Sequence, residues 1–183
     1  MKQCPYDCEV WATSTVLLYK SVPYEKITRV FAFDREDRIS DTLDIARRRG
    51  IPIWSMRDYA DCKYPIDEIV AKLRKKYFLN TISFMIALAI YEGYEKLKFF
   101  GIDQGPQWKY LAGKPYVMYW IGQADGRGIK TEHPPMTVLF QTHVEEIKKG
   151  VAESKQRGLK NLVESGGGLI KIKAPSIEEL REG

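Results

Sequence analysis

The residues best suited to chemistry in this chain lie on either side of an apolar segment that begins after Asn80. Asn80 is a favoured helix N-cap, and Thr81 and Ser83 follow within the first turn, so free backbone N–H groups and two hydroxyls come together. Helix N-termini of this kind bind anions such as phosphate. Asp103 follows the next expected strand. The pattern predicts half of a nucleotide or phosphate site.

Asn80 and Asp103 can form one site only if the segment between them folds back on itself. Residues 82–90 are apolar on nearly every face, which indicates a helix buried against a sheet. Gly93 ends the helix, and residues 96–102 form a strand that runs back along it. Ligands of open α/β sheets bind at the carboxyl ends of strands. We therefore predict that Asp103 is catalytic and that Gln104, in the following loop, contacts the ligand.

Three further polar residues lie where the same edge is expected. His133 ends the last expected strand and titrates near neutrality, so it is the second catalytic candidate, as a general base. Asp34 follows a strand and would suit a ribose hydroxyl or a metal ion. Arg127, in a Gly-Arg-Gly turn, could bind a phosphate through two hydrogen bonds. Each of these residues also fits an ordinary role in a turn, a strand end or a solvated surface.

Strand and helix patterns alternate through the first three quarters of the chain. Alternation of this kind implies parallel strands joined by right-handed crossovers. We predict a three-layer, Rossmann-like α/β domain with a mostly parallel sheet over residues 1–141. The strands are expected at 9–13, 29–33, 52–56, 97–102 and 129–132, and the helices at 40–49, 65–77, from 80 to Gly93, and 115–125.

The character of the sequence changes at Thr142. Residues 144–156 form a strongly charged helical stretch with a narrow apolar stripe, and three consecutive glycines follow at 166–168. Such a stripe cannot stabilise an isolated helix. We predict a C-terminal helical arm over residues 142–183 that packs either on a second subunit, in a homodimer, or on its own domain.

The composition restricts the classes of partner. The chain has 183 residues and a formal net charge of +5, from 29 basic and 24 acidic residues, which favours an anionic small molecule. Nucleic acid stays open but is not favoured, because the basic clusters occupy helix ends and faces that are usually solvated. No apolar run approaches the ~20 residues of a membrane span, and no signal peptide opens the chain. We expect a cytoplasmic protein without membrane contact.

The cysteine pattern and the glycine pattern each argue against a common class of site. Three cysteines and two histidines, with no second cysteine pair, do not favour a zinc site, so we predict no structural metal. Neither G-x-G-x-x-G nor G-x-x-x-x-G-K-[ST] occurs, which argues against a Rossmann dehydrogenase and a P-loop enzyme. A nucleotide or nucleotide-sugar ligand, with or without Mg²⁺, fits what is left.

Several motifs together resemble known proteins. They are N-T-x-S, the helix A-L-A-I-Y-E-G-Y, a strand ending F-G-I-D, then Y-W-I-G-x-A-x-G-R-G-I and a trailing P-P. This pattern resembles small Rossmann-like proteins encoded by bacteriophages, whose biochemical role is generally unassigned. Its core is also similar to the MptE-like pterin diphosphokinase family and to bacterial sialyltransferases that use CMP-sialic acid. The resemblance covers residues 9–139.

The resemblance implies where a nucleotide would bind. In the two enzyme families the Ser/Thr loop before the helix lies beside the nucleotide phosphates, which corresponds here to Asn80, Thr81 and Ser83. The acid that ends the next strand lies at the same edge and corresponds to Asp103. The implied function is a nucleotide-dependent transferase that transfers a glycosyl or diphosphoryl group. The alternative is a non-catalytic phage accessory factor that binds a nucleotide or a protein.

Overall fold

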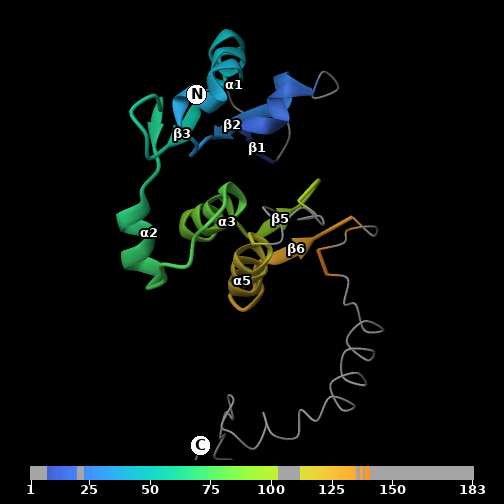
Figure 1. Ribbon diagram of the computed structural model, residues 1–183. Helices are drawn as coiled ribbons and strands as arrows, with labels where there is room; N and C mark the ends of the chain where they lie inside the picture. The colour runs from blue at the N-terminus through green and yellow to red at the C-terminus, as the bar shows by residue number, and fades with distance from the viewer. Residues whose placement is uncertain (1–7, 20–22, 103–111, 135–136, 138, 141–183) are drawn as a thin grey trace, which may run out of the picture. The chain divides into compact units, whose positions relative to one another are not determined.

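The strands of the main sheet lie side by side in the order in which they occur along the chain (Figure 1). The computed structural model describes residues 8–19, 23–102, 112–134, 137, 139 and 140. All neighbouring strands of this sheet are parallel. The strands are β1 (Val10–Thr13), β2 (Ile27–Phe31), β3 (Ile53–Ser55) and β4 (Cys62–Lys63).

Helices lie between β1 and β2 and between β2 and β3, and more follow β4, which confirms a mixed α/β fold with a parallel sheet. Two short 3₁₀ helices, η1 (Ser14–Leu18) and η2 (Tyr24–Lys26), connect β1 to β2. A second, two-stranded parallel sheet contains β5 (Lys96–Lys98) and β6 (Lys130–Glu132). The α-helices are α1 (Glu36–Arg49), α2 (Ile66–Leu73), α3 (Thr81–Glu92) and α5 (Lys114–Asp125).

Local sequence signals set the helix ends. Gly50 and Gly93 both have positive φ, at 65° and 84°, and their left-handed conformation ends α1 and α3 as predicted. Helix α1 begins at Glu36 rather than at Ser40, because Glu36 and Asp37 stabilise the positive end of the helix dipole. Helix α2 stops at Leu73, short of the predicted end, since Arg74 adopts a left-handed conformation with φ 55°.

The core consists of two hydrophobic clusters, and the neighbouring residues Val30 and Phe31 of β2 belong to different ones. Val30 belongs to a cluster with Leu43 and Ala46 of α1, whereas Phe31 belongs to a cluster that includes Ile86 of α3. Successive side chains of a strand point to opposite faces of a sheet. The main sheet therefore packs against α1 on one face and against the cluster containing α3 on the other.

The strands were expected in one sheet, and here the structure differs. Strands β5 and β6 pair with each other, and neither is hydrogen-bonded to β1–β4. Charge pairing stabilises the small sheet, since Lys96 and Lys98 contact the carboxylate of Glu132 at 2.6 and 3.2 Å. Strand β4 was not predicted, and β5 ends earlier than the predicted strand 97–102.

The described residues belong to one compact unit, residues 1–140. The predicted C-terminal arm, residues 142–183, lies outside the described residues. Among the residues that the structure describes, no helix is both long enough and apolar enough to cross a membrane.

Candidate functional site

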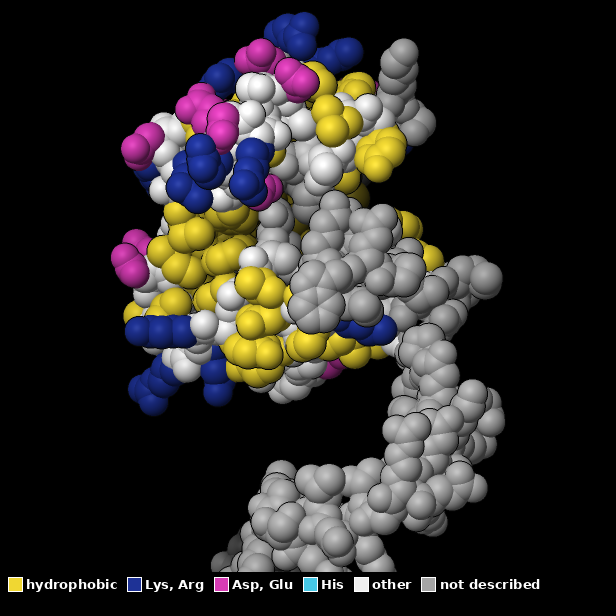
Figure 2. Space-filling view, in the orientation of Figure 1, with side chains coloured by type: hydrophobic (Ala, Val, Ile, Leu, Met, Phe, Trp, Pro, Cys, Tyr) yellow, Lys and Arg dark blue, Asp and Glu magenta, His cyan; other side chains and the backbone are white. Residues whose placement is uncertain are grey.

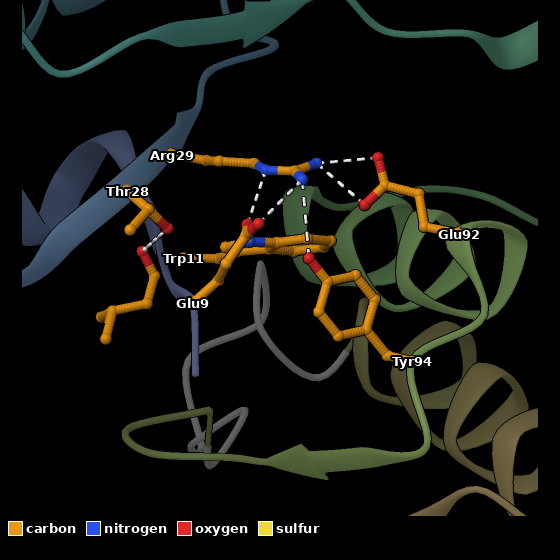
Figure 3. A network of polar contacts seen from close by, with 7 residues as sticks. Glu9, Trp11, Thr28, Arg29, Glu92 and Tyr94 are labelled. Atoms are coloured by element: carbon orange, nitrogen blue, oxygen red, sulfur yellow. Dashed lines mark hydrogen bonds and ion pairs between the residues drawn. The ribbon is translucent and has the colours of Figure 1, made fainter. Parts of the chain in front are cut away.

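The carboxyl ends of the parallel strands meet at one edge of the main sheet, and the start of α3 lies there too. Phe33, just after β2, contacts Phe84 in the first turn of α3, with ring centroids 4.6 Å apart. At the other end of the helix, Glu92 pairs with Arg29 of β2 at 2.8 Å (Figure 3). Helix α3 therefore runs antiparallel to β2 and begins at the carboxyl edge, as the sequence predicts.

The loop after β2 carries Asp34 and is held by two residues that follow β3. The Tyr59 hydroxyl donates to the carbonyl oxygens of Asp34 and Ala32, at 2.7 and 2.9 Å. Arg57 Nε donates to the carbonyl oxygen of Phe33 at 3.3 Å. Burial raises the pKa of the Tyr59 phenol, so the hydroxyl stays protonated and remains a donor. Asp34 itself is exposed on this fixed loop.

An open hollow lies against the same loop and the start of α1. Its volume is about 650 Å³. Two guanidinium groups and three carboxylates line it, so it suits a ligand with both hydroxyl and anionic groups better than a bare anion. Arg35 pairs with Asp37 at 3.1 Å across its rim. The lining residues are Arg35, Glu36, Asp37, Arg57, Asp58 and Tyr59.

Three consecutive hydroxyl residues, of which the first ends β1, lie at this edge. Thr13 is register partner of Phe31, the last residue of β2, so the ends of the two strands are level. Thr13 Oγ1 lies 3.5 Å from Thr15 Oγ1, and Ser14 between them is buried. None of these residues was predicted, nor were Arg57 and Tyr59. Ser14, Thr15 and Arg57 directly follow predicted strands, so a signal was available for them, whereas the role of Tyr59 depends on a hydrogen bond to Asp34 O.

The predicted residues at the start of α3 have structural hydrogen bonds. Asn80 Oδ1 accepts from Ser83 N at 3.0 Å, and Asn80 Nδ2 donates to Gly113 O at 3.3 Å. Ser83 is fully buried, and its hydroxyl donates to Asn80 O at 2.6 Å. Thr81 is half-buried. Asn80 and Ser83 thus cap the helix, and a ligand contact by any of the three stays a prediction.

His133 follows β6 and is packed among aromatic rings. It stacks on Phe99, with centroids 5.0 Å apart, and contacts Phe140 edge-on at 4.3 Å. Burial lowers its pKa, which outweighs the opposing charge of Asp125, so the imidazole is neutral near pH 7. Its Nδ1 is buried and finds no hydrogen-bond partner among the described residues.

Among the described residues, no hydrogen bond connects His133 to another predicted site residue. Arg127 is exposed, and its Nη1 donates to the carbonyl and side-chain oxygens of Gln123, at 3.0 and 2.7 Å, at the end of α5. Asp103 and Gln104 lie outside the described residues. In the described part of the chain, no group of three His, Cys, Asp or Glu residues could hold a metal ion.

No family model matches the chain, and neither a curated protein nor a solved structure matches it.

Proposed function

We propose that this protein binds a nucleotide at the carboxyl edge of its parallel sheet, as a three-layer Rossmann-like domain. The observation that supports the proposal most is the fixed loop after β2. Tyr59 and Arg57 donate to the carbonyl oxygens of Asp34 and Phe33, so the backbone that carries the exposed Asp34 carboxylate is fixed. A carboxylate in this position is well suited to accept hydrogen bonds from ribose hydroxyls.

The proposed orientation of the ligand follows from the different side chains at two places along the carboxyl edge of the sheet. The nucleoside would lie in the hollow that Arg57 and Asp58 help to line, next to the loop that carries Asp34, where carboxylates can bind hydroxyls. The phosphates would lie toward the hydroxyls of Thr13 and Thr15 and the start of α3 at Thr81. A helix N-terminus and neutral donors stabilise phosphate without a dedicated lysine.

Two activities are compatible with such a site. A transferase would use the bound nucleotide as the donor of a glycosyl or diphosphoryl group and would stabilise the phosphate that leaves. A non-catalytic accessory factor would only bind it. The surroundings of His133 favour the second candidate, because its Nδ1 is buried and the residue follows β6, which belongs to the other sheet from the strand before Asp34.

A thermal-shift screen with nucleotides, nucleotide sugars and pterins, each with and without Mg²⁺, tests the proposal. We expect at least one nucleotide to raise Tm, and Asp34→Asn to weaken its binding by about tenfold, as for the loss of one charged hydrogen bond. Asp44→Asn is the matched control, since Asp44 is also an exposed carboxylate but belongs to α1 and not to the loop after β2. Equal affinity of the two variants would contradict the site.

A second measurement separates the two activities. The protein is incubated with the nucleotide that binds most tightly, and the products are separated by chromatography. Release of the free nucleotide from a nucleotide sugar, with the glycosyl group passed to water when no other acceptor is present, would identify a catalyst of glycosyl transfer, provided that Asp34→Asn lowers the rate. Tight binding without turnover of any donor in the screen would identify a binding protein.

A further inference from the structure

The segment that leads from α2 into α3 forms a surface with several basic side chains, and this segment contains no acidic residue. Between Glu68 and Glu92 the chain contains no Asp or Glu. The same stretch contains Lys72, Arg74, Lys75 and Lys76, and the last three are exposed where α2 ends. Figure 2 shows dark blue side chains at the lower left, where α2 ends, beside a yellow hydrophobic area. The charge here is strongly one-sided, although the whole chain carries only +5.

Exposed aromatic and apolar side chains follow the basic ones directly. Tyr77 is 42% exposed and Leu79 is 54% exposed. Tyr77 stacks on Tyr116 of α5, with centroids 4.2 Å apart and an angle of 16° between the rings, and Tyr119 meets it edge-on at 5.0 Å. Tyr77 is therefore supported on one side by α5 and remains accessible to a planar ligand.

The surface is held rigidly by contacts that do not use its exposed groups. Trp120 Nε1 donates to the carbonyl oxygen of Tyr77 at 2.7 Å, and Phe78 stacks on the Trp120 ring at 5.0 Å. Trp120 is fully buried. The segment from Arg74 to Leu79 is thus fixed to α5 through its backbone and through Phe78, while its basic side chains and Tyr77 stay exposed.

We propose that this surface, formed by Arg74, Lys75, Lys76, Tyr77 and Leu79 with Tyr116, binds single-stranded nucleic acid. Lysine and arginine side chains neutralise the phosphates, and a supported aromatic ring stacks on a base. Leu79 adds apolar contact beside the ring. The proposal is independent of the nucleotide site, because none of these residues lines the hollow or holds the Asp34 loop.

The combination of charges and rings favours a single strand over the other polyanions. A duplex hides the faces of its bases, so Tyr77 would have nothing to stack on. An acidic protein segment would use the basic residues but would gain little from an exposed tyrosine. A single strand offers phosphates and unpaired bases together.

Fluorescence anisotropy with the full-length protein and labelled oligonucleotides tests this inference. The probes are single strands of DNA and RNA of about 20 nucleotides, a duplex of the same length and an acidic peptide. We expect the single strands to bind more tightly than the duplex and the peptide. Affinity should fall as salt is raised from about 50 to about 200 mM, because counterions are released on binding.

Two variants with one matched control locate the binding surface. The triple variant Arg74→Gln, Lys75→Gln, Lys76→Gln should weaken binding at least tenfold. The slope of the logarithm of the binding constant against the logarithm of the salt concentration should become less steep by about 2, because each lost phosphate contact contributes about 0.7. The control is Arg38→Gln, Arg47→Gln, Arg48→Gln, which removes three exposed basic residues from α1. It lowers the net charge equally and should retain most of the affinity.

A second pair of variants tests the stacking. Tyr77→Leu should weaken binding of the single strands at least about fivefold, the range for one lost base stack, whereas Tyr77→Phe should preserve it. Circular dichroism and thermal melting show whether each variant is folded, so only folded variants enter the comparison. Equal losses in the two charge variants, equal binding of duplex and single strand, or no binding at about 0.15 M salt would each overturn the proposal.

Discussion

The Arg29 guanidinium donates hydrogen bonds to both carboxylate oxygens of Glu92, at 2.8 and 2.9 Å, and so connects β2 to the last residue of α3 (Figure 3). Its Nε also lies 2.8 Å from the carboxylate of Glu9, before β1. The rings of Trp11 and Trp54 lie 4.6 and 4.7 Å from the guanidinium carbon. One partly buried cation thus holds three strands and a helix in register.

Removal of this cation should destabilise the fold strongly. Arg29→Gln leaves two carboxylates without their partner, in a place where the Arg29 side chain is only 16% exposed. We expect the free energy of unfolding to fall by about 3 kcal/mol. Urea denaturation followed by tryptophan fluorescence measures it.

Arg35→Gln is the control for this prediction. Arg35 pairs with Asp37 at 3.1 Å, but both side chains are more than half exposed, so the loss should be below about 1 kcal/mol. If Arg29→Gln cost no more than Arg35→Gln, the network would contribute little to stability.

The small sheet should show an acid-dependent stability that one carboxylate controls. The hydrogen bond from Lys96, with a second from Lys98, lowers the pKa of Glu132 from its ordinary value of 4.5 to about 2. A lowered pKa stabilises the folded state above pH 4.5, and this stabilisation is lost as the pH falls toward 2. Glu132→Gln should therefore be less stable than wild type above pH 4.5, and the difference should shrink as the pH falls. A difference that stays constant with pH would exclude this linkage.

His133 should titrate below its ordinary pKa of 6.5, because burial against Phe99 disfavours the charged ring. The chain has two histidines, so His143→Gln leaves one imidazole to follow by NMR. The unfolded state binds the proton more tightly than the folded state, so stability should fall as the pH drops below 6.5. A measured pKa at or above 6.5 would show that His133 is not enclosed as described.

The two hydroxyls at the start of α3 should separate stability from binding. Ser83→Ala removes a buried hydroxyl that donates to Asn80 O, so we expect a loss of about 1–2 kcal/mol in the free energy of unfolding. Thr81→Ala should leave stability nearly unchanged and weaken nucleotide binding instead. Thermal melting and calorimetric titration of both variants decide this. Equal binding by Thr81→Ala and wild type would remove Thr81 from the proposed site.

Local signals in the sequence predicted the elements better than their arrangement. The helix ends at Gly50 and Gly93 and the Asn80 cap depend on residues within one helical turn, and all three predictions are confirmed. The two-residue strand β4 has no periodicity to detect, so it was missed. The division into two sheets depends on pairing between segments far apart in the chain, such as Lys96 with Glu132.

The candidate site was predictable only in part, for the same reason. Asp34 was predicted as a ligand contact because it follows an apolar strand, and this role stays a prediction. Tyr59 was not, because its role comes from a hydrogen bond to a backbone oxygen 25 residues earlier. Ser83 looked like a ligand contact in the sequence, since nothing local indicates that its hydroxyl is buried and donates to Asn80.

The order of the strands in the main sheet has a consequence for synthesis of the chain. Each strand pairs with the strand before it, so every pairing closes a short loop, and the entropic cost is low. The whole sheet is present once the ribosome has released Lys63. Phe31, however, belongs to a cluster whose other members come largely from α3 and α5. Until those helices emerge, the nascent sheet exposes an apolar face, and surface of this kind favours aggregation during synthesis.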